Sequence, residues 1–84
     1  MAKPMSAVAL GIDLGTSAVK CVLTRQGVVI GTGSSALSVS SPHAGWSEQD
    51  PTDWIEAVKI AATRAIQAAD ISPKEIKGIS LSGQ

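Results

Sequence analysis

An acid, a glycine, two hydroxyl side chains and a lysine lie close together near the amino end of the chain. They are Asp13, Gly15, Thr16, Ser17 and Lys20. A glycine lets a polyphosphate approach the backbone N–H groups, while hydroxyls and an ammonium group add donors and positive charge. A carboxylate repels phosphate, but it can hold a hydrated Mg²⁺ that bridges to one. The cluster therefore predicts a site for a magnesium-bound polyphosphate, with Asp13 on the metal side.

An ordinary hairpin turn is the alternative interpretation of this cluster, because Asp, Gly, Thr and Ser are also the commonest turn residues. The position of Asp13 favours the functional interpretation. It comes directly after the apolar run 8–12, where a purely structural strand would use a neutral residue. Lys20 has a structural alternative of its own, as a solvated lysine on an edge strand.

Two apolar runs, 8–13 and 18–24, flank the cluster and have the length of strands. Their nearly continuous apolar character predicts strands that are central in a sheet or buried on both faces. The stretch 25–27 predicts a second hairpin turn, with Gly27 in the left-handed conformation.

A third strand begins at 28–30, and the glycine- and serine-rich stretch 31–35 follows it. That stretch is either a flexible linker or a twisted edge strand. The alternation of apolar and polar residues at 37–40, with no charged run in between, favours the strand.

The segment 51–69 has the spacing of an amphipathic helix, with Asp50 as its cap and Pro51 in its first turn. Asp53 lies favourably near its positive end. The predicted apolar stripe consists of Trp54, Val58, Ala61, Ala62, Ala65, Ile66 and Ala69.

A last strand is predicted over 76–82, with Ile79 and Leu81 on one face and the intervening serines on the other. Because a helical crossover precedes this strand, it can lie parallel to the first one. That topology brings Asp13 and the segment 83–84 to the carboxyl ends of neighbouring strands, where α/β sheets bind ligands.

Composition limits the other classes of function. The chain has 84 residues, enough for one small domain, with a net charge of zero and two tryptophans as its only aromatic residues. This composition offers no basic surface for nucleic acid or an anionic membrane, and no stacking platform for bases. Neither nucleic acid nor a membrane is therefore expected as a partner. The single Cys21 lies in an apolar run and predicts a buried, inert thiol, consistent with the cytoplasm.

The run GIDLGTSAVK at 11–20 resembles the first phosphate motif of the FGGY carbohydrate kinases, relatives of actin, hexokinase and the heat-shock chaperone ATPases. The stretches GWSEQDPTDW at 45–54 and ISLSGQ at 79–84 are most similar to the xylulose-specific members, the xylulokinases. The resemblance implies a ribonuclease-H-like α/β fold that starts with three antiparallel strands, a crossover helix and a parallel strand. It also implies that 8–84 is the beginning of the first kinase domain, with the rest of that domain and the second domain absent. The polar, proline-containing start of the chain predicts a disordered lead-in at 1–7.

The activity that this resemblance implies is the ATP- and Mg²⁺-dependent phosphorylation of a sugar, D-xylulose to D-xylulose 5-phosphate, in the cytoplasm. The family's catalytic base and adenine pocket lie outside this chain, so the fragment alone is expected to be inactive. Gluconate, ribulose or glycerol specificity is an alternative, as is a small α/β module that binds a partner without catalysis. A homodimer of the full-length protein is also expected.

The resemblance assigns a role to each member of the cluster and to the last residue. The acid of the phosphate motif, Asp13, would act at the transferring phosphoryl group and hold Mg²⁺ through water. Gln84 would lie beside the sugar. The residues that would border the ATP phosphates are Gly15, Thr16, Ser17 and Lys20.

Overall fold

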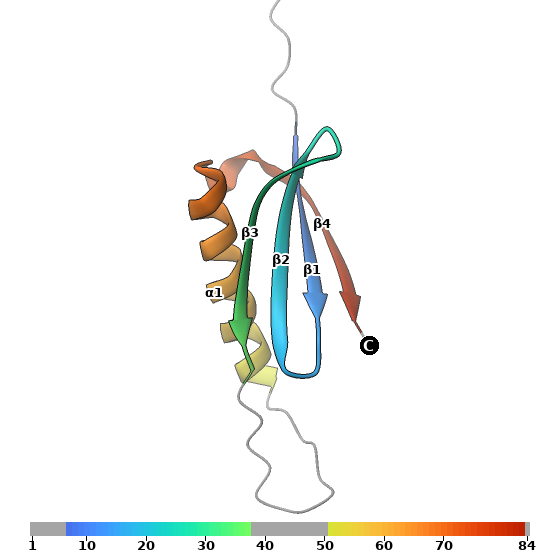
Figure 1. Cartoon of the computed structure of the whole chain (residues 1–84), viewed down its shortest axis with the longest axis vertical. Helices are drawn as coiled ribbons and strands as arrows, with labels where there is room; N and C mark the ends of the chain where they lie inside the picture. The colour runs from blue at the N-terminus through green and yellow to red at the C-terminus, as the bar shows by residue number, and fades with distance from the viewer. Residues whose placement is uncertain (1–6, 38–50, 84) are drawn as a thin grey trace, which may run out of the picture.

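The computed structural model describes residues 7–37 and 51–83, which form one mixed β-sheet with a helix on one face (Figure 1). The strands are β1 (Val8–Leu14), β2 (Ala18–Arg25), β3 (Val28–Ala36) and β4 (Ile76–Gly83), and the helix is α1 (Pro51–Ala69). The sheet order is β3-β2-β1-β4, with β1 to β3 antiparallel and β4 parallel to β1. This arrangement confirms the predicted start of the ribonuclease-H-like fold.

The turn between β2 and β3 consists of Gln26 and Gly27, whose φ angles are 53° and 78°. Positive φ at both central residues of a two-residue hairpin is type I′ geometry, whose twist matches that of the flanking strands. The left-handed conformation predicted for Gly27 is confirmed.

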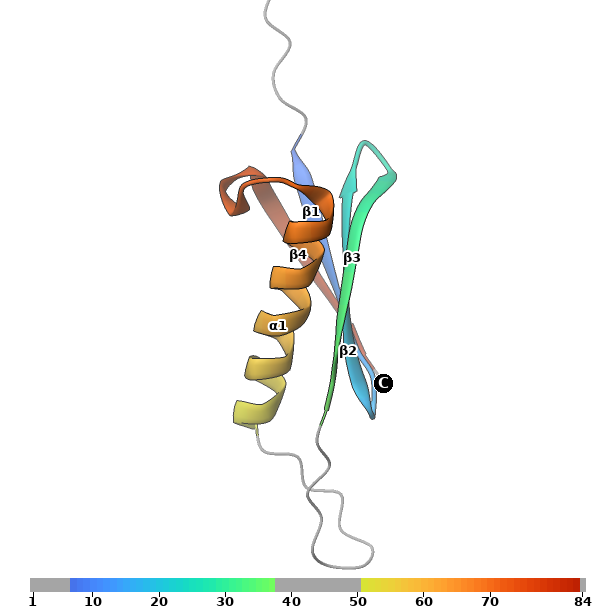
Figure 2. The same cartoon turned by 60° about the vertical axis from the view of Figure 1, so that its left-hand side comes forward.

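α1 covers one face of the sheet, over β2 and β3 (Figure 2). The core there combines aliphatic side chains and a thiol from the strands with a row of alanines from the helix. Its buried members are Val8, Leu10, Val19, Cys21, Leu23, Leu37, Ala57, Ala61 and Ala65. Because side chains alternate between the faces of a strand, the intervening residues of β1 and β2 point to the opposite face. No element in the described part of the chain covers that open face, so the two strands are central but not buried on both faces.

Two glycines of β3 lie where α1 passes closest to the sheet. A Cβ atom on Gly31 would lie 2.6 Å from the carbonyl oxygen of Ala65, and one on Gly33 would lie under 3.0 Å from that of Ala61. Real Cβ atoms do not approach other atoms so closely, so both positions require glycine for the helix to pack at this distance. Both glycines lie within β3, so the stretch 31–35 is part of a strand and not a linker.

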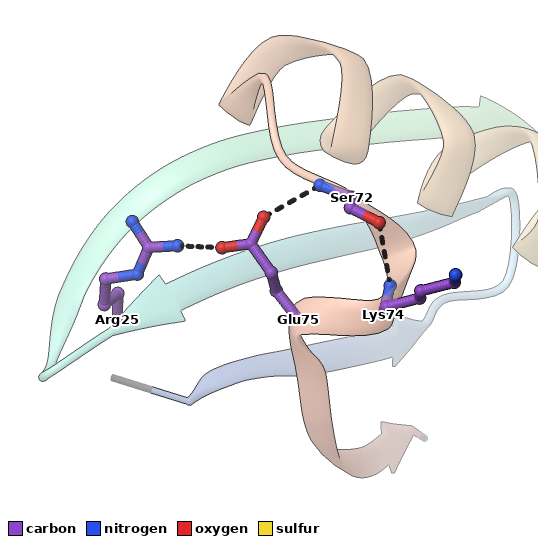
Figure 3. A network of polar contacts seen from close by, with 4 residues as sticks. All are labelled: Arg25, Ser72, Lys74 and Glu75. Carbon is purple, nitrogen blue, oxygen red and sulfur yellow. Dashed lines mark hydrogen bonds and ion pairs between the residues drawn. The ribbon is translucent and has the colours of Figure 1, made fainter. Parts of the chain in front are cut away.

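A small polar network joins the end of β2 to the start of β4 (Figure 3). The 3₁₀ turn η1 (Pro73–Glu75) carries a capping box, in which the Lys74 N–H donates to Ser72 Oγ at 3.3 Å and the Ser72 N–H to Glu75 Oε2 at 2.9 Å. Arg25 Nη2 donates to the other oxygen, Glu75 Oε1, at 2.7 Å. One carboxylate thus serves both as a cap and as an ion-pair partner across the sheet.

The predicted apolar stripe of α1 is partly wrong. Trp54 is 39% exposed, whereas Ala57, which lies outside the predicted stripe, is 3% exposed. Where α1 passes closest to β3, its residues nearest Gly31 and Gly33 include Ala61 and Ala65, so small side chains line this contact. Trp54 lies nearer the start of α1, outside this contact.

Several sequence predictions concern residues outside 7–37 and 51–83. These are most of the lead-in, the cap at Asp50 and the roles of Gln84. The strand predicted over 37–40 lies outside the described residues except for Leu37, which is buried and follows the end of β3.

Candidate functional site

A row of polar side chains crosses all four strands on the open face of the sheet. Asp13 pairs with Lys20 across β1 and β2, and with Ser82 across β1 and β4. Lys20 in turn pairs with Ser34 across β2 and β3. Because paired residues of neighbouring strands point to the same face, the order along this row is Ser34, Lys20, Asp13, Ser82. The sequence-predicted acid and lysine are thus direct neighbours.

Both charges of this row are exposed to solvent. Among the residues that the structure describes, the one ion pair joins Arg25 and Glu75, so Asp13 and Lys20 do not form one with each other. Both charged groups are therefore accessible to ligand groups. The edge-strand part of the alternative for Lys20 is wrong, because β2 lies inside the sheet, whereas the exposure of Lys20 agrees with a solvated lysine.

The turn at the end of the β1–β2 hairpin is held by two backbone hydrogen bonds. The Gly15 N–H donates to the Ala18 carbonyl oxygen at 2.9 Å, and the Leu37 N–H donates to that of Ser17 at 2.8 Å. The first bond uses the Gly15 N–H within the turn itself. Gly15 does not adopt a positive φ. The close approach of the Ala18 carbonyl oxygen explains why this residue is a glycine, since a Cβ atom here would lie 3.0 Å from that oxygen.

The predicted hydroxyl residues Thr16 and Ser17 lie in this turn and are both exposed. The turn follows Leu14, one residue after Asp13, so its hydroxyls lie at the end of the sheet next to the polar row. At the same end Gly83 pairs with Leu14. Gln84, the predicted sugar neighbour, directly follows Gly83 and lies outside the described residues.

Two residues of the row, Ser34 and Ser82, were not among the predicted site residues. The alternation of 76–82 does predict that Ser82 points away from Leu81. The pairing register that brings it beside Asp13, however, joins the two ends of the chain and cannot be derived from local periodicity.

The row fits a hydrated magnesium ion and its phosphate ligands. Mg²⁺ keeps several of its waters and is bound in proteins through one or two carboxylates together with substrate phosphates. Asp13 supplies one carboxylate, and Lys20 supplies a positive charge on the neighbouring strand for phosphate oxygens. Within residues 7–37 and 51–83 there is no group of three or more His, Cys, Asp or Glu side chains suited to a metal. The arrangement therefore suits a magnesium–phosphate complex better than a metal held by the protein alone.

Cys21 lies on the opposite face from the row and is buried, as expected. Burial raises the pKa of its thiol, because the thiolate would lose its solvation. A buried neutral thiol is a poor nucleophile, so Cys21 belongs to the core and not to the site.

The sequence matches one family model over nearly its whole length. Residues 8–84 match the amino-terminal domain of the FGGY family of carbohydrate kinases. The chain belongs to the FGGY family. The fold agrees with this membership, because the four-stranded sheet with its helix matches solved sugar kinases.

Individual FGGY relatives include several xylulose kinases. The xylulose kinase of Staphylococcus epidermidis strain ATCC 12228 is 50% identical over 78 residues, which are 92% of this chain and 16% of that protein. A solved structure named as a "xyloylose kinase" from Brucella ovis is 49% identical, with a TM-score of 0.76 over 92% of this chain and 16% of that one. The gluconate kinase structure from Lactobacillus acidophilus is 30% identical, with a TM-score of 0.79 over 94% of this chain and 16% of that one.

The chain spans about a sixth of the length of these FGGY relatives, since the matched part is 16% of each. In the described part of the chain, α1 is not apolar enough over its length to cross a membrane, and no other helix is long enough.

Proposed function

We propose that this chain carries the first phosphate site of an ATP-dependent sugar kinase that converts D-xylulose to D-xylulose 5-phosphate in the cytoplasm. One observation supports the phosphate site above others: Asp13 and Lys20 are exposed direct partners in the β1–β2 ladder and do not form an ion pair with each other. The proposal of D-xylulose is supported by the identity of up to 50% with curated xylulose kinases.

Phosphoryl transfer depends mainly on positioning and on neutralising the charge of the phosphoryl oxygens. A bound Mg²⁺ would supply part of that neutralisation. In this proposal the Asp13 carboxylate would hold the metal through water, and the Lys20 ammonium group would attract the phosphates from the neighbouring strand. The hydroxyls of Thr16 and Ser17 border the phosphates at the end of the hairpin. Asp13 is not the base that deprotonates the sugar, because a carboxylate beside a metal ion is a poor base.

A gluconate substrate is the second candidate, because the gluconate kinase structure from Lactobacillus acidophilus has a TM-score of 0.79 with this chain. Its sequence identity of 30% is lower than the 49% of the Brucella ovis structure, so we favour D-xylulose.

ADP release tests this proposal when the 84-residue chain and the complete gene product are compared. Each is supplied with Mg²⁺-ATP and with D-xylulose, ribulose, gluconate or glycerol. We expect no turnover by the 84-residue chain and the highest kcat/KM of the complete product with D-xylulose. Sugar-dependent turnover by the short chain would contradict the proposal, because the catalytic base would then lie within these residues.

The Asp13→Asn variant of the complete gene product tests the phosphate site itself. We expect at least a hundredfold loss of kcat and weaker binding of Mg²⁺-ATP in calorimetry. Asp53→Asn in the first turn of α1 is the matched control, since it removes the same charge away from the polar row. If both variants bind Mg²⁺-ATP as the parent does, the site is wrong and a non-enzymatic binding module becomes the better interpretation.

A further inference from the structure

Two serines of β4 flank β1 on the open face of the sheet. Ser82 is the partner of Asp13, and Ser80 is the partner of Gly11, one side-chain step further along the same face. Both serines are exposed. Asp13 therefore has an ammonium group on its β2 side and a hydroxyl group on its β4 side.

Gly11 leaves the surface beside Asp13 low and open. A Cβ atom at Gly11 would meet Ser80 Oγ at 3.7 Å and the Val22 carbonyl oxygen at 3.8 Å, which are ordinary contact distances. Gly11 also does not adopt a positive φ. Neither packing nor backbone conformation therefore requires glycine here, although glycine inside a strand costs conformational entropy. A glycine at this position leaves the open face without a side chain next to Asp13 on β1 and next to Ser80 on β4.

The charge of Lys20 would favour one side of Asp13 for a cation. The ammonium group would repel a hydrated metal ion and attract phosphate oxygens, which favours the β4 side of Asp13 for the metal and the β2 side for the phosphates. On the β4 side the hydroxyl of Ser82 would be available to accept a hydrogen bond from a water of the metal. This separation of metal from phosphates depends on the order Lys20, Asp13, Ser82 along the polar row.

We propose that Ser82 is a positioning residue that holds the hydrated metal ion of Asp13 on the β4 side of the site. This inference rests on the proposed function, because it assumes that Asp13 binds a metal–nucleotide complex.

Mn²⁺ binding to the complete gene product, measured by electron paramagnetic resonance with a non-hydrolysable ATP analogue, tests the proposal without turnover. We expect Ser82→Ala to raise the dissociation constant of Mn²⁺ about two- to tenfold, the effect of one lost hydrogen bond. Ser82→Thr keeps the hydroxyl and should restore the parent value. Ser80→Ala is the matched control on the same strand and face and should leave the constant unchanged. Urea unfolding of both alanine variants verifies that they are folded to the same extent.

The Asp13→Asn variant separates failure of this inference from failure of the proposed function. If Asp13→Asn leaves Mn²⁺ affinity unchanged, the phosphate site itself is wrong and the role of Ser82 falls with it. If Asp13→Asn weakens Mn²⁺ binding but Ser82→Ala behaves like Ser80→Ala, the inference alone is overturned. A raised KM for the sugar with unchanged Mn²⁺ affinity in Ser82→Ala would also overturn it and would assign Ser82 to the sugar.

Discussion

Asp13 and Lys20 are direct partners in an antiparallel ladder, yet their side chains do not form an ion pair with each other in the part of the chain that the structure describes. An opposite pair at this spacing can stabilise a sheet, but an exposed pair contributes little to folding. We therefore expect the two charges to contribute little to folding stability, in keeping with the ligand-binding roles proposed for them.

Lys20→Met in the complete gene product should weaken Mg²⁺-ATP binding about tenfold or more, because a charged donor to phosphate is lost. Lys77→Met is the control, since Lys77 is also exposed but lies on β4 near the opposite end of the sheet. Calorimetry at two salt concentrations measures the affinity for Mg²⁺-ATP. The affinity of the parent protein should fall more with added salt than that of the Lys20→Met variant. Equal losses in the two variants would contradict a specific role for Lys20.

Gly33→Ala should destabilise the chain by about 1–3 kcal/mol, because the new methyl group forces α1 away from β3. Gly78→Ala is the matched control on β4, where a Cβ atom would meet nothing within 4 Å. The free energies of unfolding come from urea titrations of the two variants and the parent. A Gly33→Ala variant as stable as Gly78→Ala would mean that the helix does not pack this closely.

Glu75→Gln should destabilise the chain by about 0.5–1 kcal/mol, since it removes an ion pair that is only partly buried. Glutamine keeps an oxygen that can accept the Ser72 N–H, so Glu75→Ala should cost more than Glu75→Gln. A double-mutant cycle with Arg25→Met isolates the ion pair and should give a coupling that falls as salt is added. A coupling that does not respond to salt would argue against an electrostatic contribution.

Cys21 should make stability fall at alkaline pH. Burial raises the pKa of its thiol above the ordinary 9.0 in the folded chain, so the unfolded chain loses its proton first as pH rises. The contribution of this thiol to the free energy of unfolding is complete below the thiol pKa of the unfolded chain. It is lost as pH rises from there through the raised pKa of the folded chain. Urea midpoints between pH 7 and pH 10 measure the loss, which should be smaller in Cys21→Ala even though that variant is less stable throughout. An identical alkaline slope in both proteins would contradict this explanation.

Much of the fold could be predicted from the sequence because its signals are local. Helix α1 has the predicted bounds, and each strand begins where its apolar run begins. The turn at Gly27 was predictable for the same reason, because turn chemistry depends on neighbouring residues. The exposure of Trp54 was not predictable, since periodicity shows which residues share a side of the helix but not which of them the sheet covers.

The site was predictable only in part. Residue types indicated Asp13 and Lys20, whereas the places of Ser34 and Ser82 beside them depend on strand register. Register across a crossover is fixed by tertiary packing and not by local pattern. The use of the Gly15 N–H inside its own turn likewise required the backbone geometry.

The strand pairing also predicts the order in which the residues of the polar row come together during folding. Asp13 and Lys20 are brought together by a tight hairpin, whereas Ser82 comes from the opposite end of the sequence. Closing a long loop costs more entropy than closing a short one, and contacts between distant segments form more slowly. During synthesis from the amino end, we therefore expect Asp13 and Lys20 to be able to pair before β4 has left the ribosome, and Ser82 to join them last.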